Sequence, residues 1–460
     1  MRSTESQNAP RTRSTVEASE GVRKPRGTSV TKLTAAGTRP PPHAMASIER
    51  PFDVTMLVTV ALLMGFGVVM VYSASVGVAD MTYGDPLRFL KAHLLHLAVG
   101  VIAFGVGMGL NYQFYRRLVY PLLVLAMGLL VLTWAFGEVR GNARRWIELG
   151  PLDFQAAELV KVAFVIYLAY SLEKKIEEMV SWTVSYLPHL VVGGAFMTLL
   201  VFQPDLGSAL LLAAVLMAMQ VVAGTRWTNV VATIFLAVPL GLGYITASRA
   251  TRWEAWVGNP WDVRDGAGYQ PVQALMSIGS GGWNGLGLGA GRQKMGFLTQ
   301  SHTDFIYATV GEELGFVGCG FVIALFCVLC WRGYRAAWKA PDRFGRYLAF
   351  GFTTLFGVQA FVNMAVATTL LPTKGLNLPF VSGGGTSMLF SCFAAGVLLN
   401  ISRYAEAPST WRPMAVPDSS KPRATADFVN VKRPEKKPVK FKGQVGPGVV
   451  AFDRNTGRGR

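Results

Sequence analysis

The segment QSHTDFIYATVGEELG, Gln300–Gly315, places polar and charged residues at the start of an apolar run. A His, a Thr and Asp304 stand directly before the run, and Glu312 and Glu313 lie within it. The run is long enough for a membrane-spanning helix, which needs about 20 mostly apolar residues. Because a carboxylate at the bilayer centre costs about 2.5–3.5 kcal/mol on insertion scales, each of these acids needs a partner or a function.

Similar apolar runs recur along the whole chain. Its 460 residues are 51% hydrophobic, with a mean hydropathy of +0.35, although the net charge is +17. The sequence therefore predicts an all-α polytopic membrane protein with about ten transmembrane helices. The ten candidate segments are Val54–Tyr72, Leu94–Leu110, Leu118–Phe136, Ala156–Leu172, Leu187–Phe202, Ser208–Ala223, Val230–Ile245, Phe305–Trp331, Leu348–Leu371 and Val381–Ile401.

The predicted organisation has three parts. Residues 1–50 and 404–460 are basic and rich in polar residues and Pro, which predicts disordered tails, and residues 51–403 form the membrane domain. The first 50 residues lack the apolar stretch of a signal peptide. The longest connection, Ser248–Asp304 between the seventh and eighth helices, has room for structure and function of its own.

The distribution of cations predicts the orientation. Ten spans put both tails on one side, and Lys and Arg concentrate in the cytoplasm. Residues 1–52 hold nine of the 44 cations and residues 402–460 hold thirteen, which places both tails in the cytoplasm and the large loop outside. The outer loops then carry eleven cations and the inner loops ten. Either an anionic ligand favours this outer charge, or acidic residues in the same loops neutralise it.

Charged residues also lie near the ends of the predicted spans. Glu158 and Lys161 are three residues apart, so they share a helix face and can pair; a salt bridge at the membrane interface is the alternative reading. Asp304 or Thr303 could cap the following helix. Capping by one residue does not explain why His302, Thr303 and Asp304 occur together.

A glycine-rich stretch, GSGGWNGLGLGAG at Gly279–Gly291, lies in the large loop. It lacks the preceding buried strand of a dinucleotide-binding fingerprint. It therefore predicts either a close backbone approach to a ligand or a re-entrant turn packed against protein. Around this loop, the outer face gathers a polar cluster that favours an amphiphilic, anionic ligand but does not choose between transport and chemistry. The cluster comprises Arg144, Arg145, Trp146, Asp205, Asp304 and Lys374.

Several motifs carry a family resemblance. The most specific is the block Asn259–Gly318, and GNARRWI, QPDLGS and LPTKGLNLPFVSGGGTS accompany it in order. Over roughly Pro51–Arg403 the sequence resembles the SEDS family (shape, elongation, division and sporulation). Lys374, in Thr-Lys-Gly, resembles the division-type members.

The resemblance implies a ten-helix fold with a large extracytoplasmic loop between helices 7 and 8. It implies a glycosyltransferase that polymerises lipid II, an undecaprenyl-pyrophosphoryl disaccharide-peptide, into peptidoglycan strands for the division septum. The expected partners are a class B penicillin-binding transpeptidase and other division proteins, and no nucleic acid is expected. The expected location is the bacterial cytoplasmic membrane.

The resemblance also implies roles for individual residues. Asp304 matches the catalytic aspartate of the family, and Trp146 matches a tryptophan linked to activity. Glu158 and Lys161 match a charged pair in the family's Gln-Pro-Ser-Glu helix, although this chain lacks the Pro-Ser element.

These residues suggest an inverting displacement. Because pyrophosphate leaves as a stable anion, the acid that a glycosidase needs can be omitted. Asp304 would act as general base on the acceptor hydroxyl, while Arg145, Lys374 or Lys161 offsets the charge of the leaving group. A divalent cation, Mg²⁺ or Mn²⁺, could assist, but no motif predicts a dedicated metal site. The substrate-binding candidates are Arg145, Trp146, Glu158, Lys161, His302, Thr303 and Lys374.

Two other functions fit a polytopic protein with intramembrane charge. One is a flippase or transporter of the lipid-linked cell-wall precursor. The other is a scaffold that recruits division proteins through its tails. The lack of an obvious inverted repeat weighs mildly against the transporter.

Overall fold

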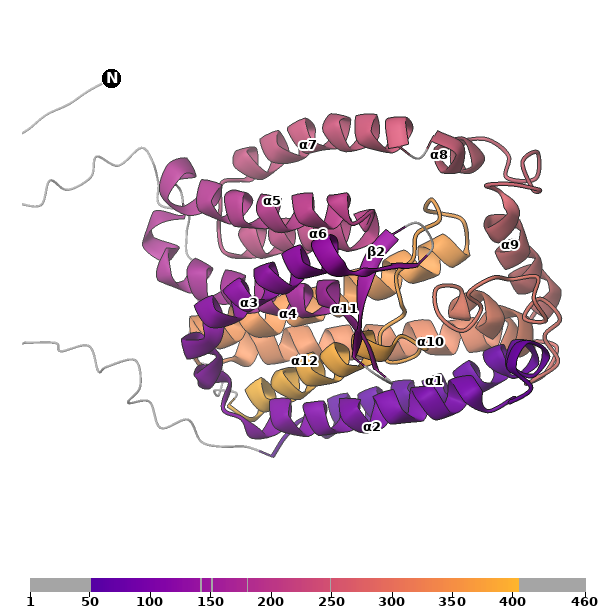
Figure 1. Ribbon diagram of the computed structural model, residues 1–460. Helices are drawn as coiled ribbons and strands as arrows, with labels where there is room; N and C mark the ends of the chain where they lie inside the picture. Colours follow the sequence, from indigo (N-terminus) through magenta and orange to yellow (C-terminus); the bar gives the residue numbers. More distant parts are fainter. Residues whose placement is uncertain (1–50, 141–142, 150–151, 180, 249, 405–460) are drawn as a thin grey trace, which may run out of the picture.

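The computed structural model describes residues 51–404, except 141–142, 150–151, 180 and 249. The predicted tails lie outside the described residues, apart from Tyr404. Ten helices of the described part form one bundle and correspond to the ten predicted segments (Figure 1). They are α1 Val54–Tyr83, α2 Arg88–Gly109, α3 Tyr115–Phe136, α4 Ala156–Lys174, α5 Leu187–Phe202, α6 Leu206–Val222, α7 Trp227–Ser248, α10 Ile306–Lys339, α11 Arg343–Ala367 and α12 Gly385–Arg403.

Eight of the described helices are long and apolar enough to cross a membrane, namely α1, α2, α3, α5 with its preceding turn Trp182–Tyr186, α7, α10, α11 and α12. The other two helices of the bundle, α6 and α4, differ from these eight in length or in charge. Helix α6 has 17 residues, and α4 carries Glu158 and Lys161 near its start. In α4, 16 of 19 residues are buried, because it lies inside the bundle with protein on all sides. The chain is a multi-pass, predominantly helical membrane protein.

Helices α2 and α12 pack closely, which joins the early and late parts of the bundle. A Cβ at Gly107 would clash with Phe393 O, and a Cβ at Gly396 would clash with Phe104 O. Small residues permit this backbone approach in membranes. At the end of the bundle where α1 begins and α12 ends, Asp53 N donates to Ser402 Oγ (3.3 Å). The described chain therefore enters and leaves the bundle at the same end.

A small antiparallel sheet between α3 and α4 was not predicted. Its strands are β1 Glu138–Arg140, β2 Ala143–Leu149 and β3 Leu152–Gln155, in the order β1-β2-β3. Strands this short give too little alternation for a sequence pattern to detect. In β2, Arg144 pairs with Val139 and Trp146 pairs with Glu138, so Arg145 is an extra residue at a bulge.

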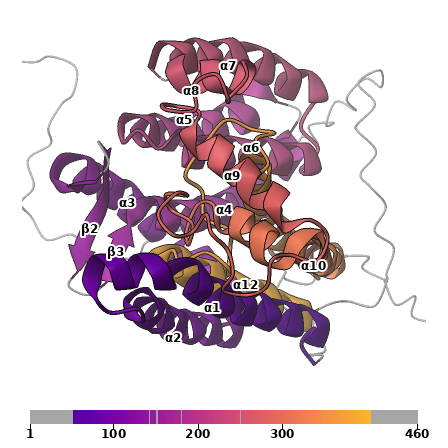
Figure 2. The ribbon, with the colours of Figure 1, turned by 90° about the vertical axis from the view of Figure 1, so that its right-hand side faces the viewer.

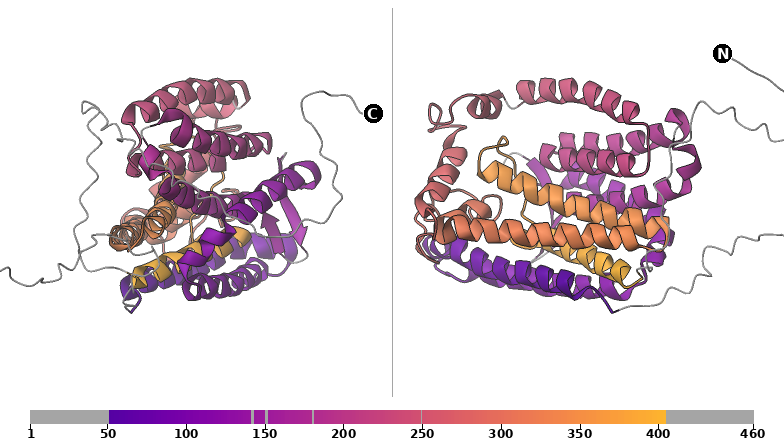
Figure 3. Two further views of the ribbon diagram at one scale, coloured as in Figure 1. Left: turned by 90° about the vertical axis from the view of Figure 1, so that its left-hand side faces the viewer. Right: turned by 180° about the vertical axis from the view of Figure 1, so that it is seen from behind.

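The opposite end of the bundle carries most of the irregular chain, and we call it the loop end. The connection from α7 to α10 contains helix α8, Ala250–Val257, and helix α9, Tyr269–Gly281. Figure 2 looks onto this end, with α8 and α9 in front of the bundle. From behind, α10 and α11 run side by side below α7 (Figure 3). The predicted large loop thus contains two helices.

Helix α10 is interrupted where the glycine-rich segment meets it. Gly315 has φ 64° and ψ −160°, which breaks the helical hydrogen bonding. Gly285 (φ 79°) lies so close that a Cβ would overlap Glu313 O. The glycine-rich stretch is therefore packed against protein, with its backbone on the backbone of α10. Four backbone bonds replace the lost helical ones: Leu286 N to Glu312 O (3.0 Å), Gly287 N to Glu313 O (3.0 Å), Phe316 N to Gly282 O (2.9 Å) and Val317 N to Trp283 O (3.2 Å).

Candidate functional site

A cavity of about 1140 Å³ lies at the loop end. Side chains from α1, α2, the small sheet, α4, α6, α8 and α9 line it, together with the segments before α10 and α12. All but one of the predicted site residues reach it. Those in its wall are Arg145, Trp146, Glu158, His302, Thr303, Asp304 and Lys374.

Asp304 is fixed by the main chain of its own segment. Helix α1, helix α11 and the turn before α12 each bind this segment, and in three of the four bonds the acceptor is a main-chain carbonyl of the segment itself. The side chains of His302, Thr303 and Asp304 are therefore left to face the cavity. The bonds are Ser301 Oγ to Ala74 O (3.1 Å), Gly383 N to His302 O (2.9 Å), Ser382 Oγ to Thr303 O (2.7 Å) and Asn363 Nδ2 to Asp304 O (2.9 Å).

The Asp304 carboxylate has a restricted environment. A Cβ at position 375 would lie 2.8 Å from Asp304 Oδ2, so Gly375 makes room for the carboxylate. Burial raises the pKa of Asp304 to about 6; Arg145 opposes this shift, and Asp205 adds to it. Near neutral pH this carboxyl can therefore both accept and release a proton.

The bulge in β2 brings two successive residues to the cavity. Arg145 Nε donates to Gln203 O (3.1 Å), and a second guanidinium nitrogen donates to Pro204 O. These carbonyls hold the side chain in place and use two of its five N–H donors. Trp146 follows directly and also lines the cavity. The GNARRWI and QPDLGS motifs therefore meet here.

The predicted pair in α4 is present and buried. Lys161 Nζ lies 2.7 Å from Glu158 Oε2, and their side chains are 2% and 8% exposed. Glu158 lines the cavity, whereas Lys161 lies behind it and donates to Gln359 Oε1 (3.2 Å). Gln359 Nε2 in turn donates to Asn377 O (2.9 Å) in the segment before α12. The pair is thus connected to the cavity wall on the far side.

His302 and Thr303 have neighbours that fix their side chains. The His302 ring lies 4.7 Å from the ring of Phe89 between centroids. Burial lowers the pKa of His302, so the ring is neutral at pH 7. Thr303 Oγ1 donates to Gln300 Oε1 (2.7 Å). Both residues therefore present fixed surfaces to the cavity.

Two members of the predicted polar cluster lie elsewhere. Arg144 is exposed and donates to Ala135 O (3.2 Å). Asp205 is buried and caps α6 by accepting from Ser208 N (3.2 Å). Asp205 therefore influences Asp304 by its charge rather than by lining the cavity. Within the described residues, no group of three or more His, Cys, Asp or Glu is placed to hold a metal ion, and help from a divalent cation stays a prediction.

Sequence reasoning missed several residues of the site. Arg88 and Arg252 add cations to the cavity wall. Gln359 and Asn363 join α11 to the cavity-lining segments through hydrogen bonds. These two are amides four residues apart in an apolar helix, on one face, and this pattern is a signal that could have identified them.

Comparison with known proteins places the chain in a family. Residues 54–407 match the model of the cell cycle protein family of FtsW, RodA and SpoVE. The sequence is 43% identical over 356 residues to the probable peptidoglycan glycosyltransferase FtsW of Trichlorobacter lovleyi, which covers 76% of this chain and 93% of that protein. It is 38% identical to stage V sporulation protein E of Bacillus subtilis, over 77% of this chain and 97% of that protein.

Solved structures agree with the sequence match. Rod shape determining protein RodA of Thermus thermophilus superimposes with a TM-score of 0.57 at 27% identity, over 77% of this chain and 98% of that one. A chain from a structure on coordination of polymerization and crosslinking by a peptidoglycan synthase complex gives a TM-score of 0.64 at 26% identity, over 76% and 98%. The chain belongs to the SEDS family, and within it to the division type that FtsW represents.

Proposed function

We propose that the chain is a peptidoglycan glycosyltransferase that polymerises lipid II into glycan strands for septal wall synthesis. The FtsW relatives are named probable peptidoglycan glycosyltransferases, which supports the proposal. The observation that carries it is the Asp304 carboxylate, held by its main chain at the wall of a cavity that also contains cations. A base beside positive charge is what displacement of a diphosphate by a hydroxyl requires.

Asp304 acts as the general base. It accepts the proton of the acceptor sugar hydroxyl, while the oxygen of that hydroxyl forms a bond to the anomeric carbon of the donor. The bond from this carbon to the polyprenyl pyrophosphate breaks, its electron pair stays on the leaving oxygen, and the anomeric configuration inverts. A pKa of about 6 suits a base at neutral pH, because the carboxyl is ionised yet more basic than a free aspartate.

The other cavity residues bind the substrates. Arg145 and Lys374 offset the charge of the departing pyrophosphate, which is typically the largest catalytic contribution. Trp146 provides a flat apolar face for a sugar ring, and His302 and Thr303 contact the saccharide beside the base.

The orientation follows from the substrate. The loop end faces outward, both tails lie in the cytoplasm, and the protein lies in the bacterial inner membrane. A class B penicillin-binding transpeptidase crosslinks the product strands. The likeness to a chain from a peptidoglycan synthase complex supports such a partner.

The test is polymerisation of purified lipid II by the protein with its transpeptidase partner, read as glycan strands on a gel. We expect Asp304→Ala to lose at least 10²-fold in rate while it stays folded, with a melting temperature no lower than that of the parent. Polymerisation at the parental rate by a folded Asp304→Ala protein contradicts the proposal.

A flippase is the alternative, because a polar cavity inside a helix bundle also suits transport of a lipid headgroup. Lipid II transfer across liposome membranes, with no polymer formed, would support that reading instead.

A further inference from the structure

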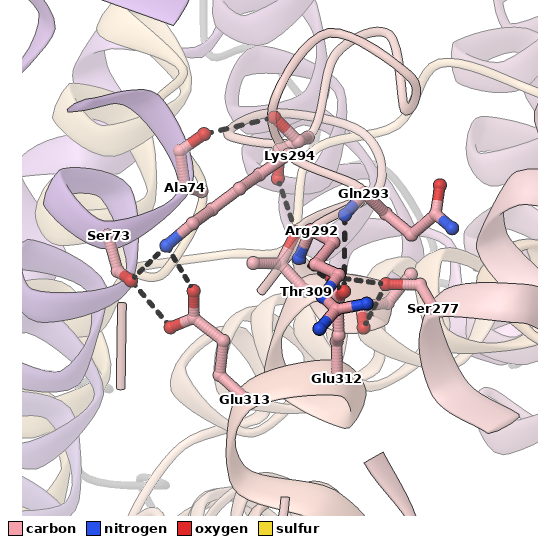
Figure 4. Close-up of polar contacts among 11 residues, drawn as sticks. Ser73, Ala74, Ser277, Arg292, Gln293, Lys294, Thr309, Glu312 and Glu313 are labelled. Carbon is pink, nitrogen blue, oxygen red and sulfur yellow. Dashed lines mark hydrogen bonds and ion pairs between the residues drawn. The ribbon is translucent and has the colours of Figure 1, made fainter. Parts of the chain in front are cut away.

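A second set of charged side chains is buried where residues 292–294 meet α10 and α1 (Figure 4). Lys294 Nζ lies 2.5 Å from Glu313 Oε1, and their side chains are 2% and 0% exposed. Ser73 Oγ of α1 donates to Glu313 Oε2 (2.5 Å) and accepts from Lys294 Nζ (3.1 Å). None of the three lines the cavity. A substrate in the cavity therefore does not touch them, and any effect they have on it must pass through the protein structure.

The side chain of the neighbouring Glu312 binds the backbone of the two residues before Lys294. Its Oε1 accepts from Arg292 N (2.6 Å) and Gln293 N (3.1 Å), and its Oε2 accepts from Ser277 Oγ (3.2 Å). The two glutamates thus bind three successive residues, 292 to 294, to α10 (Figure 4). Both carboxylates are fully engaged with protein, which accounts for acids within an apolar run.

The fixed segment leads directly to Asp304. Ser301 Oγ donates to Ala74 O (3.1 Å), next to Ser73 on α1, and Thr309 Oγ1 of α10 donates to Ser301 O (3.3 Å). The stretch from Lys294 to Ser301 is therefore attached at both ends to the same two helices. Asp304 follows three residues later, where Asn363 and the turn before α12 also hold the main chain, so the Lys294 attachment is one of several supports of its segment.

The chemistry of the first attachment is informative. A buried ion pair contributes little net stability, because the desolvation of both charges offsets their attraction, and apolar residues of similar size often serve as well. What a buried pair does provide is a single allowed arrangement, since either charge without the other is strongly unfavourable. The Lys294–Glu313 pair thus specifies where the segment must sit.

We propose that Lys294 and Glu313 are positioning residues, which hold the 294–304 segment so that the Asp304 carboxylate stays in its half-buried place at the cavity wall. This proposal rests on the proposed function, in which Asp304 is the base. Without the pair, the segment moves relative to α1, and more water reaches the carboxylate.

The double variant Lys294→Met/Glu313→Gln tests this, because it removes both charges together and leaves no unpaired buried ion. We expect kcat to fall about 10²-fold with KM within twofold of the parent, as a displacement of about 1 Å at a reacting group produces. Since the segment stays attached at Ser301, the variant should still fold.

The pH profile separates positioning from simple destabilisation. In the parent, activity falls as pH drops through about 6, where Asp304 is protonated. Greater hydration of the carboxylate lowers its pKa, so the acid limb of kcat/KM, which reports the free enzyme, moves below 6 in the variant, toward about 4. The other charged or titratable groups of the cavity, and Asp205 beside it, are unchanged by the substitution: Tyr83 in α1, Arg88 and His96 in α2, Arg145 in β2, Asp153 in β3, Glu158 in α4, Asp205 before α6, Arg252 in α8, His302 in the same segment as Asp304, and Lys374 before α12.

A matched pair at the other end of the bundle serves as control. Arg332 and Asp53 lie 2.5 Å apart, with side chains 19% and 11% exposed. Arg332→Met/Asp53→Asn should leave the pH profile unchanged. If the Lys294/Glu313 variant keeps its acid limb at about 6, or keeps the parental kcat, the pair is structural only and the proposal is wrong.

Hydrogen–deuterium exchange provides a readout without catalysis. Amides of residues 294–305 should exchange at least tenfold faster in the Lys294/Glu313 variant than in the parent or the control. This result would stand even if Asp304→Ala proved active, so failure of the positioning proposal and failure of the proposed function are distinguishable. Unchanged exchange in this segment would overturn the positioning proposal.

Discussion

The two buried ion pairs at the loop end use the same chemistry for different tasks. Glu158 and Lys161 belong to one helix, and the carboxylate of this pair faces the cavity. Lys294 and Glu313 come from different segments and are closed off from the cavity. The first pair can act on a ligand, and the second can act only on the fold. Charge buried near a site is therefore not by itself evidence of contact with substrate.

The largest effect should follow from separating the cavity-facing pair. In Lys161→Met, Glu158 keeps its negative charge with no cation beside it, next to the expected position of a diphosphate. We predict a loss of about 10²–10³-fold in kcat/KM, because the unpaired carboxylate opposes the negative charge that develops on the leaving group. Stability should fall as well, by about 3–5 kcal/mol, because a buried charge is left without its partner. Steady-state polymerisation of lipid II measures the loss in kcat/KM.

A neutral version of the same pair refines that prediction. Glu158→Gln/Lys161→Met should fold as well as the parent, yet recover little activity if the Lys161 charge serves the leaving group. Full recovery of polymerisation activity would mean that the α4 pair, like Lys294–Glu313, has only a structural role.

Next in size is an effect on stability at the break in α10. Gly285→Ala places a methyl group against Glu313 O, at a φ of 79° that disfavours alanine. We expect a loss of about 3 kcal/mol, measured as a drop in melting temperature in detergent. Gly279→Ala is the control, because a Cβ there meets nothing within 4 Å. Equal melting temperatures for the two variants would show that the glycine-rich segment does not need its close contact with α10.

The difference between the pairs also explains what the sequence could reveal. The spacing of Glu158 and Lys161 is local, so helix geometry alone predicts their contact, and it is present. Lys294 and Glu313 are 19 residues apart with an irregular loop and a helix start between them. No sequence periodicity relates such positions, so their contact could be identified only from the three-dimensional structure.

The same reasoning applies to the fold and the cavity. Ten apolar runs predicted the ten helices, because each run satisfies its own backbone hydrogen bonds. The small sheet that carries Arg145 and Trp146 was missed, because pairing between short strands leaves little pattern in the chain. Asp304 was found from its motif and resemblance. Gln359 and Asn363, which connect the walls of the cavity, were not singled out although their spacing was visible.

Unlike the carboxylates of the two buried ion pairs, that of Asp304 has no ion-pair partner among the described residues. Among the described residues, none donates a hydrogen bond to its side chain, and its pKa is raised from 3.8 to about 6. The raised pKa means that the folded state prefers the protonated acid, so stability is full below about pH 4 and is lost as pH rises through about 6.

Asp304→Asn should therefore be more stable than the parent at pH 7.5, by about 2 kcal/mol after allowance for partial solvent exposure, and equal to it at pH 4. Thermal unfolding in detergent at the two pH values measures the difference. A parent as stable as the variant at pH 7.5 would indicate that water already solvates the carboxylate and that Asp304 is not held in a restricted site.

The smallest effect should come from an ion pair with no burial at all. Lys91 Nζ lies 2.9 Å from Asp85 Oδ2 between α1 and α2, and the two side chains are 63% and 43% exposed. Water and salt screen such a pair, so Lys91→Met should change neither the melting temperature nor the polymerisation rate measurably. The same measurements in 0.05 and 0.5 M salt complete the test. A salt-dependent loss of activity in Lys91→Met would mean that positive charge at the loop end of α2 steers the anionic substrate toward the cavity. The ion pairs would then differ in their place relative to the cavity as well as in their burial.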